Sequence, residues 1–407
     1  MTPAAWMAAI GLVAGSYDVT AISVVLVHLR HLWHLTASQT ANLTAAPLLG
    51  SVVGSIVAGA LADRFGRRVL LLTDFATFVV AAVMAALAHG YWSLLIWRAI
   101  MGLGIGADFA VVFPYLVETL KPGHRGATMA LVLWISDVGQ VVAYGVGGLL
   151  VGTGPNGFRW VLLIGAAMGA VTLVSRRALP ETEPWLKRRL GSVGRIAHRA
   201  LRLDALKTAG SSAILWFLHQ VTGQGLTLFL PLIIALLWSQ DASQSGYEAI
   251  LVKLLSLAGG FATIFVIDRW GRRPLQWAGF LGRGLALLPL GLLVLTGSHA
   301  PFWVAGILLS VALAFGAMGP DKTTVIATAE RFSTGIRASG QGEAEMVGRL
   351  GGIFGVLLFG LLNGPHGLGW SLLAFSGVAL LGALLTALTL PETKPRPGLM
   401  EPDQVAS

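Results

Sequence analysis

The stretch LADRFGRRVLLL, from Leu61 to Leu72, has a near copy in VIDRWGRRPL, from Val266 to Leu275. Each time, the phrase Asp-Arg-aromatic-Gly-Arg-Arg interrupts a run of apolar residues. The two aspartates, Asp63 and Asp268, are 268 − 63 = 205 residues apart. A charged phrase that occurs once in each half of an apolar chain predicts a duplicated structural unit.

Two further phrases repeat at almost the same offset. ETLKPGHRG begins at Glu118 and ERFSTGIRA at Glu330, an offset of 330 − 118 = 212 residues. PETEP begins at Pro180 and PETKP at Pro391, an offset of 391 − 180 = 211 residues. One duplication explains all three offsets. Parallel repeats of this kind build transporters in which one half rocks against the other around a central site.

The composition predicts a membrane protein. Of the 407 residues, 55% are hydrophobic and 12% are charged, and the mean hydropathy is +0.75. A soluble domain has roughly 25% charged residues. The first apolar stretch, residues 4–27, is long enough to span a bilayer and too long for the apolar part of a signal peptide. The chain has no cysteine, which excludes disulfides and thiolate chemistry.

Twelve stretches are apolar enough to span the membrane, and helices are expected because lipid cannot hydrogen-bond to free backbone groups. The predicted fold is an all-α membrane protein with twelve transmembrane helices, in two six-helix bundles related by a pseudo-twofold axis. The expected spans are residues 4–27, 42–62, 69–89, 91–117, 126–152, 158–176, 208–237, 246–267, 274–297, 301–328, 338–363 and 367–389. The expected units are an N-terminal bundle at 1–176, a cytoplasmic linker at 177–207, a C-terminal bundle at 208–390 and a cytoplasmic tail at 391–407.

The distribution of positive charge predicts the orientation. With both ends inside, the inner segments hold 21 of the 28 Lys and Arg residues, Arg176 among them, and the outer loops hold only Arg30 and Arg159. Five lie within spans, and of these Lys253 and Arg283 are expected near span ends or packed against acids. Such a bias places both termini in the cytoplasm. The expected location is the plasma membrane, in a prokaryote the inner membrane. Because the net charge of +9 is loop charge of this kind, it does not indicate nucleic-acid binding.

The repeated phrases lie at cytoplasmic span ends and predict a gate. The glycine of DRFGRR permits a tight turn, and its arginines are expected at the lipid headgroups. Glutamate and arginine are seven residues apart in both ETLKPGHR and ERFSTGIR, and they can make charge-assisted contacts with these loops. The alternative is that these charges only determine the orientation of the spans in the membrane. The residues expected in the gate are Asp63, Arg64, Arg67, Arg68, Glu118, Arg125, Asp268, Arg269, Arg272, Arg273, Glu330 and Arg337.

Several of these phrases resemble the signatures of one family. GALADRFGRR resembles the loop between the second and third spans of the major facilitator superfamily, and RAIMGLGIGADF resembles its fourth-span signature. PETEPWL and PETKP resemble the phrases that end each half in its sugar-porter-like branch. The resemblance covers the whole chain and implies a transporter that works by alternating access.

A narrower resemblance is to proton-coupled phosphate symporters. GPDKTTVIATAERFSTGIRASGQGEAEMVGRLGG is similar to their tenth-to-eleventh span phrase, and SYDV, GIGADF and WFLHQVTGQGL are similar to phrases of the first, fourth and seventh spans. The chain departs from that pattern at Phe109, Gln220, Gln224, Asp321 and Arg349, where the family has Tyr, Asp, Tyr, Asn and Lys. A proton-carrying acid is therefore lost from one span and gained in another.

Charges inside the spans indicate function, because each costs about 2.5–3.5 kcal/mol to insert at the bilayer centre. Asp18 has no charged residue one turn away on its own helix, and Asp108 follows the glycines of GLGIG, which let a neighbouring helix come close. We expect Asp108 to carry protons, and Asp18 to carry protons or to contact the substrate. Arg98 is assigned to coupling or structure by the family resemblance. The alternatives are a helix-packing hydrogen bond for Asp18 and an ion pair between Asp108 and Arg98.

Polar residues on four other spans predict a solute site. Trp216, Gln220 and Gln224 are spaced by four residues and share a helix face. Asp321 follows a Gly-Pro break that frees backbone groups, and the guanidinium of Arg349 suits phosphate or carboxylate. The alternatives are hydrogen bonding between helices for the face of Trp216 and an intrahelical pair with Glu345 for Arg349. The family resemblance adds a further solute contact, Gln140, which shares a helix face with Asp137.

The predicted function is secondary active transport of a small polar or anionic solute, either phosphate-like or an organic acid, by alternating access with proton symport. A sugar or drug-like solute moved with protons is the alternative. The chain has no Gly-x-Ser-x-Gly elbow, His-Glu-x-x-His site or nucleotide-binding P-loop, so we expect neither an enzyme nor a cofactor or metal site. The expected partners are the solute, protons and lipid, without nucleic acid, and the expected functional unit is a monomer.

Overall fold

The structure is a computed structural model that describes residues 2–120, 124–190, 197–237, 242–296, 302–333, 335–361 and 367–393. Within these ranges it consists of fifteen helices and has no strand. Ten helical segments of the described residues are long and apolar enough to cross a membrane. The prediction of an all-α membrane protein is confirmed.

The first half contributes six membrane helices. They are α1 (Pro3–Leu32), α2 (Ala37–Phe65), α3 (Arg67–Ala86), α4 (Tyr91–Thr119), α5 (Arg125–Val151) and α6 (Gly157–Arg176). The second half contributes six membrane spans of its own, two of which are interrupted. They are α8 (Ala197–Leu228) with α9 (Leu230–Leu237), α10 (Ala242–Trp270), α11 (Arg272–Leu295), α12 (Phe302–Met318) with α13 (Pro320–Arg331), α14 (Arg337–Leu361) and α15 (Gly367–Thr389).

A short basic helix, α7 (Glu183–Leu190), lies between the halves in the chain. The indole of Trp185 holds it against the first half by donating to the backbone carbonyl of Asp63 at 3.1 Å. Helix α8 begins at Ala197, inside the segment expected to be linker, so the first helix of the second half starts earlier than expected. Residues 191–196 of that segment and residues 394–407 of the expected tail lie outside the described residues.

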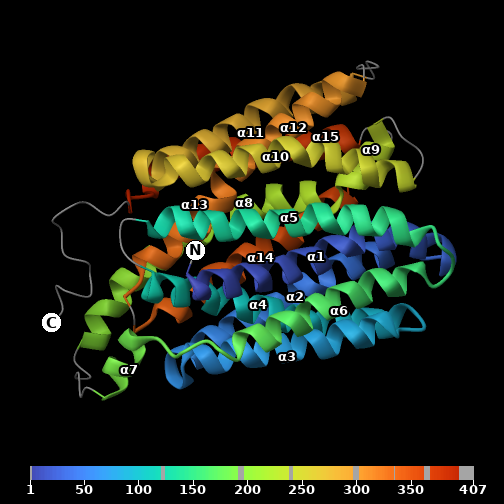
Figure 1. Cartoon of the computed structure of the whole chain (residues 1–407). Coiled ribbons are helices and arrows are strands. Elements are labelled where there is room, and N and C mark those ends of the chain that lie inside the picture. The colour runs from blue at the N-terminus through green and yellow to red at the C-terminus, as the bar shows by residue number, and fades with distance from the viewer. Residues whose placement is uncertain are drawn as a thin grey trace.

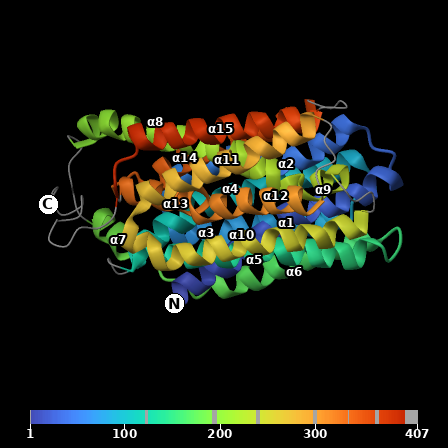
Figure 2. The same ribbon diagram turned by 90° about the horizontal axis from the view of Figure 1, so that it is seen from above.

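The helices run side by side along one long bundle, with α1 beginning and α15 ending at the end that carries α7 (Figures 1 and 2). We call this the α7 end and the opposite one the far end. Between the halves, α2 packs against α14, and α5 packs against α10. A pseudo-twofold axis that exchanges α2 with α10 and α5 with α14 converts one of these contacts into the other. The predicted arrangement of two bundles therefore matches the observed one.

Glycines set the packing of α4, as the phrase GLGIG predicts. A Cβ atom added at Gly102 or Gly106 would overlap the backbone of α2 at Pro47 or Ser51, and one added at Gly104 would overlap the backbone of α3. Contacts of this closeness are typical of membrane helices, which associate through small residues. They hold α4, with its charged side chains, deep inside the first half.

The tenth span is broken at the predicted place. Helix α12 ends at Met318 and α13 begins at Pro320, with Gly319 between them at φ −110° and ψ −101°. The carbonyl of Met318 accepts from the Thr263 hydroxyl at 2.7 Å, and the carbonyl of Gly319 accepts from the hydroxyl and the N–H of Thr323, each at 3.0 Å. The backbone groups that we expected to be free for a ligand therefore bind protein groups instead.

Candidate functional site

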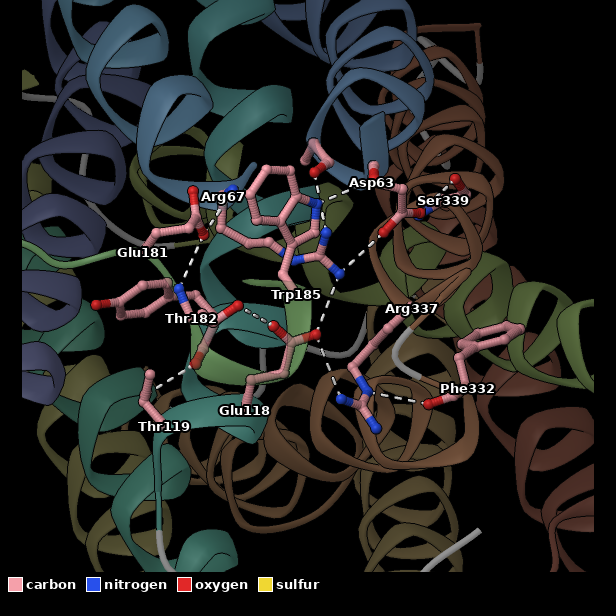
Figure 3. Close-up of polar contacts among 12 residues, drawn as sticks. Asp63, Arg67, Glu118, Thr119, Glu181, Thr182, Trp185, Phe332, Arg337 and Ser339 are labelled. Carbon is pink, nitrogen blue, oxygen red and sulfur yellow. Dashed lines mark hydrogen bonds and ion pairs between the residues drawn. The ribbon is translucent and has the colours of Figure 1, made fainter. Parts of the chain in front are cut away.

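The repeated phrase of the first half forms a buried ion-pair network at the α7 end (Figure 3). Gly66 has a positive φ of 107°, which turns the chain from α2 directly into α3. The fully buried guanidinium of Arg67 lies 3.0 Å from Asp63 and 3.1 Å from Glu118. The backbone N–H of Arg67 donates to Glu181 at 3.0 Å, so the PETEP phrase binds the same turn.

The second half contains the same network. Gly271 has a φ of 99°, and the guanidinium of Arg272 lies 3.0 Å from Asp268 and 2.7 Å from Glu330. The backbone N–H of Arg272 donates to Glu392 of the PETKP phrase at 2.9 Å. All three repeated phrases therefore meet in space, once in each half.

Each of these aspartates also binds the opposite half. Asp63 accepts from the N–H of Ser339 at 2.9 Å and from its hydroxyl at 2.6 Å. Asp268 accepts from the N–H of Ala127 at 2.9 Å. Ser339 and Ala127 are the third residues of α14 and α5, where a carboxylate satisfies a free N–H and is attracted by the helix dipole. The α7 end is thereby closed from both halves.

Glu118 joins the halves a third time. Its carboxylate, fully buried, lies between Arg67 and Arg337 of α14, the latter at 3.4 Å, and it also accepts from the Thr182 hydroxyl at 2.7 Å (Figure 3). We call the ion pairs and hydrogen bonds of Asp63, Arg67, Glu118, Asp268, Arg272 and Glu330 the closing network. It is built from residues that the sequence predicted to form the gate.

The gate residues are not all at the headgroups, as we had expected of the loop arginines. Arg67 and Arg272 are completely buried, because their guanidinium groups reach back between the helices to the glutamates. Arg125 and Arg337 are also buried, at the first positions of α5 and α14. The exposed arginines of this set are Arg64, Arg68, Arg269 and Arg273.

A cavity of about 120 Å³ lies in the centre, between the halves. It is lined by Gly15, Ser16, Val19, Thr20, Ile105, Phe109, Leu133, Ser136, Asp137, Gln140, Trp216, His219, Gln220, Gly223, Gln224, Thr227, Lys253, Asp321, Lys322, Val325 and Arg349. All six residues that the sequence predicted to bind solute are among them, namely Gln140, Trp216, Gln220, Gln224, Asp321 and Arg349. The two halves therefore contribute to one polar chamber.

Ion pairs and a hydrogen bond hold the charged side chains of this cavity. Lys322 of α13 pairs with Asp137 of α5, and the carboxylate of Asp321 lies 2.8 Å from the Arg283 guanidinium. Gln140 of α5 accepts from the Lys253 ammonium group at 2.8 Å. Lys322 and Lys253 both belong to the second half and both reach α5 of the first.

Arg349 forms the intrahelical pair that was the alternative to a solute contact. Its Nε lies 2.6 Å from the buried carboxylate of Glu345, one turn earlier on α14. Its guanidinium also lies over the ring of Phe109, 5.0 Å from the ring centroid. Arg349 therefore lines the cavity with its charge balanced by Glu345 and with a cation–π contact to Phe109.

Comparison with known proteins agrees with this architecture. The model of the Major Facilitator Superfamily matches residues 8–327, most of the chain. The chain belongs to the Major Facilitator Superfamily. Within the superfamily, the proton:xylose symporter XylE bound to 6-bromo-6-deoxy-D-glucose has the same fold, with a TM-score of 0.83 at 21% identity over 96% of both chains.

The relatives of the chain are named for the transport of different solutes. A Bacillus subtilis protein named for niacin/nicotinamide transport is 26% identical over 88% of both chains. An Oryza sativa protein named for inorganic phosphate transport is 25% identical, over 96% of this chain and 87% of its own. The glucose transporter GlcP of Staphylococcus epidermidis is 24% identical over 96% and 94%. The chain is therefore a multi-pass membrane transporter with the sugar-porter-like fold, and its relatives are transporters, not enzymes.

In this member of the superfamily, Asp18 and Arg98 form a closed pair inside the first half. The Asp18 carboxylate lies 3.0 Å from the Arg98 guanidinium, which also donates to the Asp18 carbonyl at 3.3 Å. Both residues are fully buried, and neither lines the central cavity. The partner of Asp18 comes from α4, as its own helix offers none. The alternative pair of Arg98 with Asp108 is wrong, because Arg98 binds Asp18.

Asp108 binds Arg176 instead, at 2.7 Å, and Asp74 of α3 lies 3.3 Å from the same guanidinium. Asp108 lines a small cavity of about 10 Å³ that shares Gly15, Ile105 and Phe109 with the central one. That volume is on the order of one water molecule. Asp108 therefore lies behind Phe109, one side chain away from the central cavity.

The sequence left several site residues without a function. Arg176 was counted with the cytoplasmic charges because it ends a span, yet it is buried and points back to two carboxylates. Lys253 and Arg283 were expected near span ends or packed against acids. Arg283 does pack against Asp321, whereas Lys253 faces the cavity. Their mid-span charge was the available signal, but periodicity could not tell which neighbour each would meet.

Proposed function

We propose that the chain is a secondary active transporter that moves a small polar or anionic solute across the plasma membrane by alternating access, in symport with protons. The observation that carries the proposal is the polar cavity between two pseudo-symmetric halves, with the closing network at one end. Rocking of the halves would break the contacts of Asp63 and Asp268 across the seam and open the cavity to the α7 end. Such a network is a bistable element of the kind that alternating access requires.

The α7 end faces the cytoplasm in this proposal. Helix α7 is basic, with the sequence EPWLKRRL, and most loop arginines gather at the same end. A positive charge bias of this kind marks the cytoplasmic side. Both termini and the closing network would then lie inside the cell.

Protons are carried in the first half. Asp18 and Asp108 are buried in the membrane and each binds a single arginine, Arg98 or Arg176. Protonation of either carboxylate would weaken its ion pair, because the attraction between the two groups depends on the carboxylate charge. Protonation of Asp108 would leave Arg176 paired with Asp74, 3.3 Å away. A buried acid that changes partners on protonation supports coupling between proton binding and helix position.

The solute binds in the second half's side of the cavity, among Trp216, Gln220, Gln224 and Arg349. Amide and indole N–H groups donate to oxygen atoms of a polar solute, and the lysines and arginines favour an anion. Two relatives have names that include an anion, inorganic phosphate in one and niacin, beside the neutral nicotinamide, in the other, and these names support a small anion. At Gln220, Asp321 and Arg349 the chain departs from the phosphate symporters that it resembles, which favours a solute other than phosphate.

The test is uptake by the purified full-length chain in proteoliposomes. Labelled phosphate, lactate, nicotinate and glucose are offered with and without an inwardly directed proton gradient. We expect one of the anions to accumulate only with the gradient, and the protonophore that collapses the gradient to abolish accumulation. Uptake that is identical with and without the gradient would remove proton coupling, and no uptake of any small solute would remove the transport proposal.

A sugar or drug-like solute is the second candidate, and the Glu345–Arg349 pair favours it. If Arg349 is fully balanced by Glu345, the remaining amides of Gln220 and Gln224 suit hydroxyl groups. A thermal-shift screen against phosphate, sulfate, organic acids and sugars, repeated on Arg349→Ala, separates the candidates. A sugar that stabilises both proteins equally supports the second candidate, and an anion whose effect vanishes in the variant supports the first.

A further inference from the structure

The central cavity carries one more positive charge than negative charge. Its lining has three cations, Lys253, Lys322 and Arg349, and two carboxylates, Asp137 and Asp321. The groups directly behind them, Arg283 and Glu345, add one charge of each sign. With His219 neutral, the balance is four cations against three carboxylates.

Three of the four cations have carboxylate partners. Lys322 binds Asp137, Arg283 binds Asp321 at 2.8 Å, and Arg349 binds Glu345 at 2.6 Å. The excess charge is therefore not spread evenly over the cavity. It belongs to the remaining cation, Lys253.

Lys253 is 5% exposed, and its ammonium group donates to the amide oxygen of Gln140 at 2.8 Å. Within the described residues, no carboxylate lies within ion-pair distance of Lys253. Asp137 and Asp321 are close enough to act on it electrostatically, but each is bound to another cation. An amide oxygen supplies one hydrogen bond and does not neutralise the charge.

A buried ammonium group without a counter-charge is costly, and in membrane proteins such groups lie in solute or ion pathways. A negatively charged solute can supply the counter-charge for this ammonium group. A carboxylate would accept two or three of the ammonium donors, and charge-assisted bonds of this kind are the stronger ones. A single excess charge matches a solute that carries one negative charge.

We propose that Lys253 is the residue that binds the acidic group of the solute, and that the solute is a small organic acid with one carboxylate. The inference rests on the proposed function and names its substrate class. The body of the solute would lie along Trp216 and Phe109, which give the same cavity apolar surface. Lys253 comes from α10 and Gln140 from α5, so the carboxylate would lie on the seam between the halves.

The experiment compares each acid with its neutral amide. Acetate, lactate, benzoate and nicotinate are tested against acetamide, lactamide, benzamide and nicotinamide, by thermal shift and by isothermal titration on the full-length chain in detergent at pH 7. We expect at least one carboxylate to bind and its amide not to bind. In Lys253→Met we expect its affinity to fall by about tenfold or more, the loss of one charge-assisted contact, whereas Lys253→Arg retains most of it.

Three outcomes overturn the inference. They are no binding by any of the four carboxylates, equal binding of acid and amide, and an affinity that survives in Lys253→Met while size-exclusion profiles show both proteins folded. A glucose uptake that is unchanged in Lys253→Met would also overturn it but would leave the transport proposal intact. If the wild-type chain takes up none of the solutes tested, the transport proposal itself fails.

Discussion

The two halves of this transporter are alike at the α7 end and unlike in the centre. At the α7 end, Arg67 and Arg272 each bind one aspartate and one glutamate in the same geometry. In the centre, the first half keeps Asp18 and Asp108 in ion pairs away from the cavity and contributes one carboxylate, Asp137, to its lining. The second half turns charges such as Lys253 and Asp321 toward it. The two halves therefore share the ion-pair network of the α7 end and differ in the side chains that they contribute to the central cavity.

The difference follows from what each region must do. A gate that closes a seam between two related halves can use the same contacts on both sides, because the seam itself is pseudo-symmetric. A small solute has no such symmetry, so the two walls of its cavity need different groups. We infer a division in which the first half handles protons and the second half handles the solute. Each prediction below tests one side of this division.

The largest effect is expected at the gate. Arg67→Ala leaves the fully buried Glu118 without its nearest cation, and Arg272→Ala does the same to Glu330. Breaking a buried pair from one side costs about 3–5 kcal/mol, so both variants should lose a large and similar part of their stability toward denaturant. The exposed Arg68→Ala is the matched control and should change stability by less than about 0.5 kcal/mol. A large cost in only one half would contradict the equivalence of the two networks.

The next effect concerns the proton side. An asparagine cannot release a proton, so we expect Asp18→Asn to abolish solute accumulation driven by a pH gradient while solute counterflow without a gradient persists. Gln224→Ala, in the second half, should give the opposite pattern, with weaker solute affinity and intact dependence on the gradient. Uptake in proteoliposomes measures both. Gradient-driven accumulation by Asp18→Asn would remove the assignment of protons to this residue.

A smaller effect is expected where the gate is not quite symmetric. Ser339 gives Asp63 a second hydrogen bond through its hydroxyl, and Ala127 has no hydroxyl to give Asp268. Ser339→Ala should cost the closed state about 1 kcal/mol, roughly a fivefold shift toward opening, and Ala127→Ser should favour closure. Because the chain has no cysteine, Ser136→Cys puts a single thiol in the cavity, and its labelling rate from the α7 side reports the opening. Equal labelling rates in both backgrounds would contradict the prediction.

The smallest effect is expected from removing the unpaired cation of the cavity. Without solute, Lys253→Met should be at least as heat-stable as the wild type, because the variant loses a buried charge that has no carboxylate within ion-pair distance among the described residues. Arg283→Met is the matched comparison and should lower the melting temperature, since it leaves Asp321 without its guanidinium. Differential scanning fluorimetry in detergent measures both, and a lower stability of Lys253→Met would show a partner for Lys253.

The sequence predicted what depends on local spacing and on the repeat. Hydrophobic length predicted the twelve spans, and the duplicated phrases predicted which groups meet at the α7 end. The Glu345–Arg349 pair followed from a four-residue spacing on one helix. Gly102 and Gly106 predicted the close approach of α2 to α4.

The sequence could not predict contacts that depend on how separate helices are rotated against one another. Arg176 ends a span and read as a loop charge, yet its long side chain reaches Asp74 and Asp108 on two other helices. Arg98 could equally have met Asp108 or Asp18, because both lie mid-span. The sequence could not predict that Lys253 faces the cavity, because this position depends on the packing of α10 on α5.

The exchange of aspartates across the seam has an evolutionary consequence. Asp63 accepts from a backbone N–H in the first turn of α14, in the second half, and Asp268 accepts from one in the first turn of α5, in the first half. If either aspartate is replaced by a residue that cannot accept a hydrogen bond, a backbone N–H in the first turn of a helix of the opposite half loses its partner. A substitution at either aspartate would therefore act on the helix start of the opposite half, so each half constrains the sequence of the other at this end.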